Sequence, residues 1–144
     1  FKNLDKNKDL SEIISRIKSI NPKIEIFNSY VKIKNIHTFK RSNQYLIFSG
    51  IGNSASFREI LIKNDFNIVE EKIFADHYKY KDKDILEIIE LAKKKDMRII
   101  TTEKDYIKIP NHLKEKVSFV EIYLEISEED KLIEFIKSVI NEKN

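Results

Sequence analysis

The sequence predicts an α/β protein, a three-layer sandwich around a mostly parallel, Rossmann-like sheet. Segments typical of strands alternate with segments typical of helices between residues 45 and 140, which is the pattern of βα units with right-handed crossovers. Residues 45–48 (Tyr-Leu-Ile-Phe) form an uninterrupted apolar run, as expected of a strand buried on both faces. Hydrophobic residues make up 41% and charged residues 35% of the chain, so it can bury a core and still present a solvated surface.

The segments before this strand predict a helix and an extended piece of chain. Residues 9–20 carry apolar side chains at helical spacing and stop just before a proline, which predicts an amphipathic helix. Residues 23–33 are rich in β-branched and aromatic side chains. They favour either a short ribbon or part of the main sheet, with a turn or bulge at Asn28-Ser29.

The central segments predict two βα units. After the strand at residues 45–48 we expect a helix capped by Ser54 or Ser56, and then a strand at residues 66–74. A clear helical pattern follows at residues 84–95, and its last turn is rich in lysine, which suits the helix dipole. Its inner stripe is predicted to be Ile85, Ile88, Ile89 and Ala92.

The last segments predict two more strands and a final helix. A short strand is expected at residues 97–101, and a longer one at residues 117–126. Ser127 is expected to cap the last helix. On that last strand, one shared face is predicted for Val120, Ile122, Leu124 and Ile126. The inward side chains of the last helix are predicted to be Leu132, Ile133, Ile136, Val139 and Ile140.

The composition limits the classes of function. Lys and Arg number 27 against 24 Asp and Glu, and the two signs are interspersed, which disfavours a nucleic-acid-binding surface. Cysteine is absent, which excludes disulfides and thiolate metal sites, and no metal site is predicted. No apolar run is long enough to cross a bilayer, so a soluble, cytoplasmic domain is the expectation. The only methionine is Met97, so we expect the natural protein to be longer than this chain.

Three polar segments follow strands of the predicted parallel sheet: residues 49–53, 75–80 and 101–105. Because the carboxyl ends of parallel strands meet at one edge, and this edge carries the ligand sites of open α/β sheets, we expect the three segments to form one site. This coincidence is the main indication of function that the residues themselves give.

The first of these segments contains the only two glycines, Gly50 and Gly52, followed by Asn53. Glycine permits positive φ and a close approach of backbone, and a following helix N-terminus attracts anions. The segment is therefore either a tight turn between strand and helix or a place where an anion binds. It lacks the third glycine of a dinucleotide fingerprint.

The other two segments carry titratable side chains. Asp76-His77 could orient and tune a proton-transfer group near neutral pH, or be a loop with a hydrogen-bonded histidine. Residues 101–105 (Thr101, Thr102, Glu103, Lys104 and Asp105) could be a capped turn with a solvated Glu103 and Lys104, could bind a phosphate or hydroxyl, or could lock two loops together. The residue types alone leave these alternatives open.

These segments together resemble one family. Phe48-Ser49-Gly50-Ile51-Gly52-Asn53, then Phe74-Ala75-Asp76-His77 and then Thr101-Thr102-Glu103-Lys104-Asp105 are similar in order and spacing to the C-terminal half of the tetraacyldisaccharide 4'-kinases, across residues 20–140. There are two departures. Ser54 stands where the family usually has proline, and Tyr78 stands where a second histidine is common.

The resemblance implies phosphoryl transfer from ATP to the 4'-hydroxyl of a lipid A disaccharide precursor, at the cytoplasmic face of the bacterial inner membrane. It implies a helix and inter-domain ribbon at residues 1–36 and a C-terminal α/β domain at residues 37–144. His77 resembles the family histidine that partners an aspartate of the P-loop domain, and Asp76 would orient the loop or the imidazole. Gly50, Gly52, Asn53 and residues 101–105 would lie near the substrate or nucleotide.

The resemblance also implies what this chain lacks. A P-loop needs two glycines five residues apart before a lysine, and glycines only at positions 50 and 52 cannot provide one. ATP and Mg²⁺ would then be bound mainly by an N-terminal domain outside this chain. The chain itself would reach the membrane surface only as part of the full-length protein. We therefore expect the chain alone to be inactive and to bind neither. The alternative is a free-standing α/β binding module without catalysis.

Overall fold

The computed structural model describes residues 6–141, and two compact units are distinguished within it. Residues 31–124 form the first, here called the α/β unit. Residues up to 30 and from 125 onward form the second, here called the helical unit. The expected boundary between residues 36 and 37 stays a prediction.

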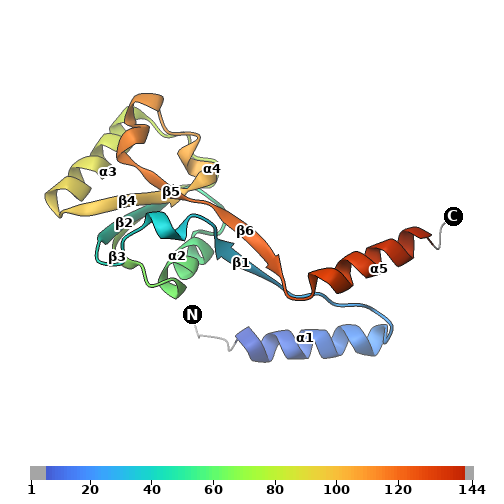
Figure 1. Ribbon diagram of the computed structural model, residues 1–144. Coiled ribbons are helices and arrows are strands. Elements are labelled where there is room, and N and C mark those ends of the chain that lie inside the picture. Colours follow the sequence, from blue (N-terminus) through green and yellow to red (C-terminus); the bar gives the residue numbers. More distant parts are fainter. Residues whose placement is uncertain (1–5, 142–144) are drawn as a thin grey trace. The chain divides into compact units, whose positions relative to one another are not determined.

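A four-stranded sheet forms the centre of the α/β unit (Figure 1). The strands are β2 (Gln44–Ser49), β3 (Asn67–Ile73), β4 (Met97–Thr102) and β5 (Ser118–Val120). Their order is β3-β2-β4-β5, and every neighbouring pair is parallel. The central strand β2 is buried from Tyr45 to Ser49, as its apolar sequence predicts.

Helices cover both faces of this sheet, which confirms the predicted three layers (Figure 1). On one face α3 (Asp82–Lys94) and the 3₁₀ helix η2 (Asn111–Lys116) pack on Leu46 and Phe48. On the other face α2 (Ser54–Lys63) packs on Tyr45 and Ile47, and the short η1 (Ile36–Thr38) adds Ile36. Successive side chains of β2 point to opposite faces of the sheet, so the core is divided between the two faces. The inner stripe of α3 is as predicted: Ile85, Ile88 and Ala92 are buried, and Ile89 packs beside them.

One strand was predicted at residues 117–126, and this prediction is wrong: the chain forms two strands there. β5 ends at Val120 and β6 (Ile122–Ile126) leaves the main sheet to pair with β1 (Ser29–Ile33) in a separate ribbon. Asn35 stabilises the break, because its side-chain NH₂ donates to Phe119 O at 2.9 Å and its oxygen accepts from Glu121 N at 3.0 Å. The expected common face is lost: Val120 is buried, whereas Ile122 and Leu124 are exposed.

The helical unit contains α1 (Lys6–Ile20), the outer part of the ribbon and α5 (Glu129–Asn141). The predicted burial of the α5 stripe is wrong for the described residues: Ile136 is 46% exposed, and no α5 side chain is buried. The predicted cap is also wrong, since the Ser127 hydroxyl donates to Asn28 O at 3.2 Å and the helix begins at Glu129. Phe135 does pack on Phe27, with ring centroids 5.9 Å apart.

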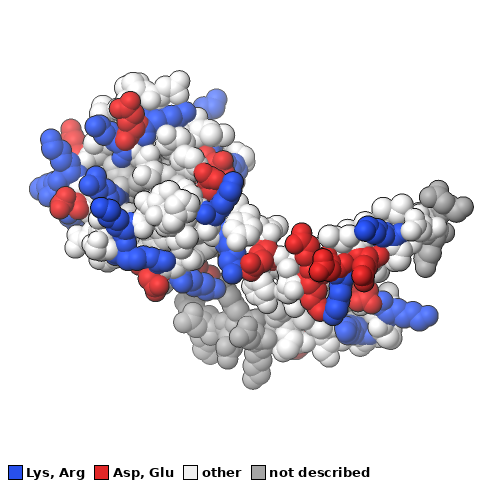
Figure 2. All heavy atoms as spheres, viewed as in Figure 1, with Lys and Arg blue, Asp and Glu red and all other residues white. Residues whose placement is uncertain are grey.

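Charges are dispersed over the α/β unit. On the face drawn in Figure 2, its Lys and Arg side chains are scattered among acidic and uncharged ones. Several are paired with acids, including Arg58 with Glu71 at 3.2 Å and Lys34 with Glu121 at 3.4 Å. Exposed pairs of this kind contribute little to stability.

Candidate functional site

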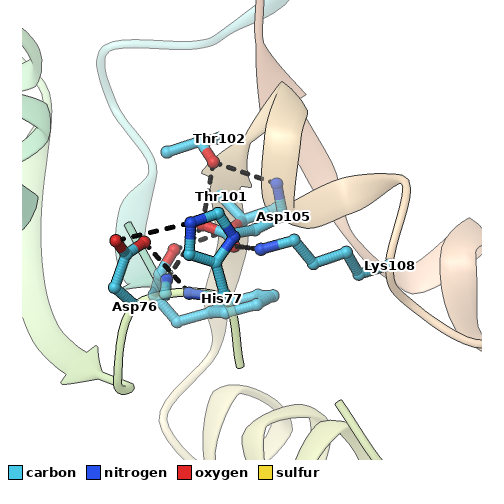
Figure 3. Close-up of polar contacts among 8 residues, drawn as sticks. Asp76, His77, Thr101, Thr102, Asp105 and Lys108 are labelled. Carbon is cyan, nitrogen blue, oxygen red and sulfur yellow. Dashed lines mark hydrogen bonds and ion pairs between the residues drawn. The ribbon is translucent and has the colours of Figure 1, made fainter. Parts of the chain in front are cut away.

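The carboxyl edge of the parallel sheet brings the three polar segments together, as predicted. Ser49 and Ile73 are register partners at the ends of β2 and β3, and Phe48 is the partner of Thr101 in β4. Backbone hydrogen bonds then join the loops: His77 N donates to Gly50 O at 3.2 Å, and Gly50 N donates to the Asp105 carboxylate at 2.9 Å. One cluster therefore contains residues from all three segments (Figure 3).

Asp76 and His77 form the outermost part of this site. His77 lies in the left-handed region at φ 60°, which is uncommon for a residue other than glycine. Its backbone N–H donates to Asp76 Oδ1 at 3.0 Å, and its ring Nε2 lies 3.7 Å from Asp76 Oδ2. The imidazole side chain is 75% exposed. It is therefore open to an external hydroxyl group while a carboxylate stands beside it, as proton transfer requires.

The glycine turn is a close-packed junction. Neither glycine has positive φ, so conformational freedom is not the reason for them. A Cβ on Gly50 would stand 2.9 Å from Tyr80 Oη and 3.2 Å from Ala75 O, so only glycine fits. Gly52 faces the Asp76 carboxylate, and Asn53, rather than Ser54 or Ser56 as expected, caps α2 by accepting from Ser56 N at 3.1 Å.

The backbone N–H of Gly50 already binds an anionic group, the carboxylate of Asp105. Asp105 is fully buried and accepts hydrogen bonds from Gly50 N, from Thr102 Oγ1 at 2.8 Å and from Lys108 Nζ at 3.0 Å. Burial alone would raise the pKa of this carboxyl, but the bonds from Gly50, Lys108 and Thr102 hold it below its ordinary value. The buried group is therefore an ionised, fully paired carboxylate.

The segment at residues 101–105 is both a capped turn and a lock between loops. Thr102 caps the short helix α4 (Glu103–Tyr106), accepting from Asp105 N at 3.1 Å. Thr101 is buried and donates to Phe48 O at 2.7 Å, which ties β4 to β2. Glu103 and Lys104 are exposed and take no part in the cluster. Hydrogen bonds join five of the ten predicted site residues to one another: Gly50, Asp76, His77, Thr102 and Asp105.

Two residues of the site were missed by the sequence reasoning. Lys108, the cation paired with Asp105, lies three residues after it, and this spacing is a signal that was available. Tyr80 is buried, and among the described residues its hydroxyl makes no hydrogen bond of ordinary geometry, although the Asp105 carboxylate lies near enough to interact with it. Burial, and then the Asp105 charge, raise the pKa of Tyr80 far above its ordinary value, so its hydroxyl stays protonated.

Tyr78 ties the histidine loop to the next helix. Its hydroxyl donates to Asp84 Oδ2 at 3.1 Å, and the same carboxylate oxygen accepts from Lys81 N at 2.9 Å at the start of α3. Its ring packs on Phe74 and Tyr80, with centroids 4.9 and 5.4 Å away. The loop that carries His77 is therefore anchored by aromatic packing on one side and by a helix N-terminus on the other.

The glycine turn at residues 50–52 does not fit a phosphate group. Gly50 N–H is engaged by Asp105, and the neighbouring Gly52 faces a second carboxylate, which would repel phosphate. Within residues 6–141 no three His, Asp or Glu side chains are arranged to hold a metal ion. In the same range, no helix combines the length and the apolar composition of a membrane span.

Fold and site together define an α/β protein with a histidine-bearing site at the carboxyl edge of a parallel sheet. Comparison with known families then assigns the chain. The model of the tetraacyldisaccharide-1-P 4'-kinase family matches residues 4–141, and the chain belongs to that family.

Relatives and a solved structure agree with this assignment. The tetraacyldisaccharide 4'-kinase of Pelagibacter ubique is 44% identical over 136 residues, covering 94% of this chain and 43% of the relative. That of Rickettsia akari is 36% identical over 141 residues, covering 92% and 43%. The structure of Aquifex aeolicus LpxK, described as an "apo" form in complex with ATP, has a TM-score of 0.52 at 21% identity, covering 85% and 40%. This last likeness supports the fold. The chain spans less than half the length of these relatives.

Proposed function

We propose that this chain is the C-terminal part of a kinase that transfers the γ-phosphate of ATP to the 4'-hydroxyl of a lipid A disaccharide precursor. Family membership supports the reaction, and the exposed His77 beside Asp76 supports a place for it at the sheet edge. A P-loop region outside this chain would bind ATP and Mg²⁺, which supply the phosphoryl group and the charge that stabilises its transfer. The same full-length protein would work at the cytoplasmic face of the inner membrane.

In this proposal His77 manages the proton of the attacking hydroxyl. The Nε2 atom faces Asp76, so a proton on Nε2 would point toward the carboxylate and leave Nδ1 free to accept the hydroxyl proton. Asp76 then orients the imidazole and stabilises it when it becomes charged. An acid–base group of this kind contributes about 10²- to 10⁴-fold to a rate.

The surface of the helical unit supports a partner region. Large apolar side chains on α1 and α5 are half exposed, including Ile13 at 52% and Ile140 at 57%. Such apolar stripes mark surfaces that another part of the protein covers. We propose that the P-loop region covers them, so that the helical unit completes that region's core and the chain alone is inactive.

The test is phosphorylation of the lipid disaccharide by the natural full-length protein that contains this segment. We expect His77→Ala to lower kcat by at least about 100-fold. His37→Ala is the matched control, because His37 is also exposed and lies in η1, which is not one of the three polar segments. Activity within a few-fold of wild type in His77→Ala would show that His77 has no catalytic role. Lipid-dependent ATP turnover by the 144-residue chain alone would contradict its proposed inactivity.

The gene distinguishes this proposal from a free-standing α/β module without catalysis. A glycine-rich P-loop with a downstream aspartate, encoded in frame before Phe1, is expected for the kinase. A stop codon or an unrelated sequence there would favour the module.

A further inference from the structure

The strongest unexplained feature of the site is the buried, ionised carboxylate of Asp105. Asp105 is 0% exposed, and both of its carboxylate oxygens are used inside the protein. A buried ion pair is weak evidence for stability, since apolar residues of similar size often stabilise a fold as well or better. A capped turn at the end of β4 needs only the Thr102 hydroxyl, which already accepts from Asp105 N. The turn therefore does not need the Asp105 carboxylate, and another role must account for it.

Two consecutive hydrogen bonds connect this carboxylate to His77. Asp105 Oδ2 accepts from Gly50 N at 2.9 Å, and the carbonyl oxygen of Gly50 accepts from His77 N at 3.2 Å. Gly50 cannot drift between them, because Tyr80 Oη, Ala75 O and Tyr78 Cβ all lie within 3.3 Å of the position where a Cβ would be. The position of Asp105 thus sets the position of the Gly50 carbonyl, to which the His77 backbone is bonded.

The conformation of His77 requires such support. A left-handed backbone is unfavourable in a residue other than glycine and persists only where the surroundings impose it. Because the imidazole is 75% exposed, packing of the ring supplies little of that constraint. The backbone N–H of His77, which donates to Gly50 O and to Asp76 Oδ1, is the main connection of this residue to the rest of the site.

We propose that Asp105 is a positioning residue for His77, acting through the backbone N–H and C=O of Gly50, with Lys108 as the counter-ion that keeps the buried carboxylate in place. This inference rests on the proposed function of His77. It assigns to Asp105 a role in the rate of proton transfer, besides any role in stability.

The experiment is a double-mutant cycle on kcat in the natural full-length protein. We expect Asp105→Asn to lower kcat between about 10- and 100-fold, the size expected for a misplaced catalytic group, and to leave the KM for ATP within twofold. In the His77→Ala background the same change should lower kcat less than twofold, because the group that Asp105 positions is gone. The double variant Asp105→Asn with Lys108→Met avoids leaving the partly buried Lys108 without its counter-ion and should behave like Asp105→Asn.

Tyr45→Phe is the matched structural control. It removes a hydrogen bond of a buried side chain, Tyr45 Oη to Lys40 O at 2.7 Å, on a residue at the opposite end of β2. It should leave kcat unchanged. In the isotope-labelled 144-residue chain, the NMR signals of the His77 amide and imidazole should shift in Asp105→Asn and in the double variant, and stay in Tyr45→Phe. This readout applies even if the kcat of His77→Ala is too low to measure.

The outcomes separate the two proposals. If His77→Ala retains kcat within a few-fold, the proposed function of His77 fails. If His77→Ala is impaired but Asp105→Asn matches Tyr45→Phe in kcat and in the His77 signals, the proposed function stands and the positioning role is wrong. An equal loss from Asp105→Asn in both backgrounds would also overturn the positioning role, because Asp105 would then act independently of His77.

Discussion

The hydroxyl oxygen of Tyr80 lies 2.9 Å from the position that a Cβ atom on Gly50 would occupy. That hydroxyl is buried and belongs to a ring packed on Phe48, with centroids 5.4 Å apart, so it cannot easily move away. Gly52, two residues on, faces only the end of the exposed Asp76 side chain at 3.3 Å. The two glycines of the turn therefore have different tolerances for a side chain.

Gly50→Ala is expected to destabilise the protein. An added methyl group that meets fixed atoms costs about 1–3 kcal/mol in the free energy of unfolding. Gly52→Ala is the control and should cost less than about 1 kcal/mol, because a flexible side chain can give way. Urea unfolding followed by circular dichroism measures both variants. Equal losses in the two would contradict the close approach described for Gly50.

Tyr80→Phe is expected to leave stability unchanged or to raise it. A buried hydroxyl that makes no hydrogen bond of ordinary geometry costs free energy, so its removal takes little that is favourable away, even with Asp105 nearby. Tyr45→Phe, which removes a hydroxyl that donates to Lys40 O, should instead lower the free energy of unfolding by about 1 kcal/mol. A larger loss from Tyr80→Phe than from Tyr45→Phe in the same urea titration would show that the Tyr80 hydroxyl has a partner.

Asp105 is expected to make stability depend on pH in the acid range. Its folded pKa lies below the ordinary value of 3.8, so at low pH the unfolded chain binds a proton more readily than the folded one. The stability that this carboxylate contributes is therefore fully present above the ordinary pKa and is lost as pH falls through the lower folded value. Unfolding midpoints between pH 2 and 7 should fall less steeply in Asp105→Asn than in wild type. Parallel curves would contradict the lowered pKa.

The apolar stripe of α5 is expected to contribute to the free energy of unfolding only when the partner region is present. Ile136 is 46% exposed in this chain, so Ile136→Ala should cost less than about 1 kcal/mol in the isolated chain. In the full-length protein, where we propose that the P-loop region covers it, the same change should cost about 2–5 kcal/mol, as a core substitution does. Ile88→Ala, at a fully buried position of α3, should cost about 2–5 kcal/mol in both. A small cost of Ile136→Ala in both proteins would argue against the covered stripe.

Much of the α/β unit could be predicted because its signals are local. The continuous apolar run of residues 45–48 became the buried central strand β2, and the helical spacing of Ile85, Ile88 and Ala92 became the buried face of α3. The three polar segments met at one edge because parallel strands place their carboxyl ends together. The capped turn at residues 101–105 was one of three alternatives that the sequence left open, and Thr102 forms it by accepting from Asp105 N.

The errors arose where a pattern shows that a face is apolar but not what covers it. The alternation of Val120, Ile122, Leu124 and Ile126 runs across Glu121, yet at Glu121 the chain leaves one sheet for another. Asn35, 86 residues earlier, holds this break. The α5 stripe has the correct period, but the described residues do not bury it. His112 lies 3.1 Å from Asp82, thirty residues earlier in the chain, a contact that no local pattern indicates.

By itself the sequence determined the layers of this protein, the identity of the polar residues that follow its strands and the family to which they are similar, because these depend on periodicity and on residue types at short spacing. Only the tertiary structure decided that a carboxylate, rather than an open anion site, meets the Gly50 turn, and that the chain of contacts runs from Asp105 through Gly50 to His77. The physical reason is distance along the chain. The hydrogen bond between Gly50 and Asp105 forms only when the connections from β2 to β3 and from β3 to β4 have placed β2 beside β4. No local propensity of the sequence indicates that arrangement.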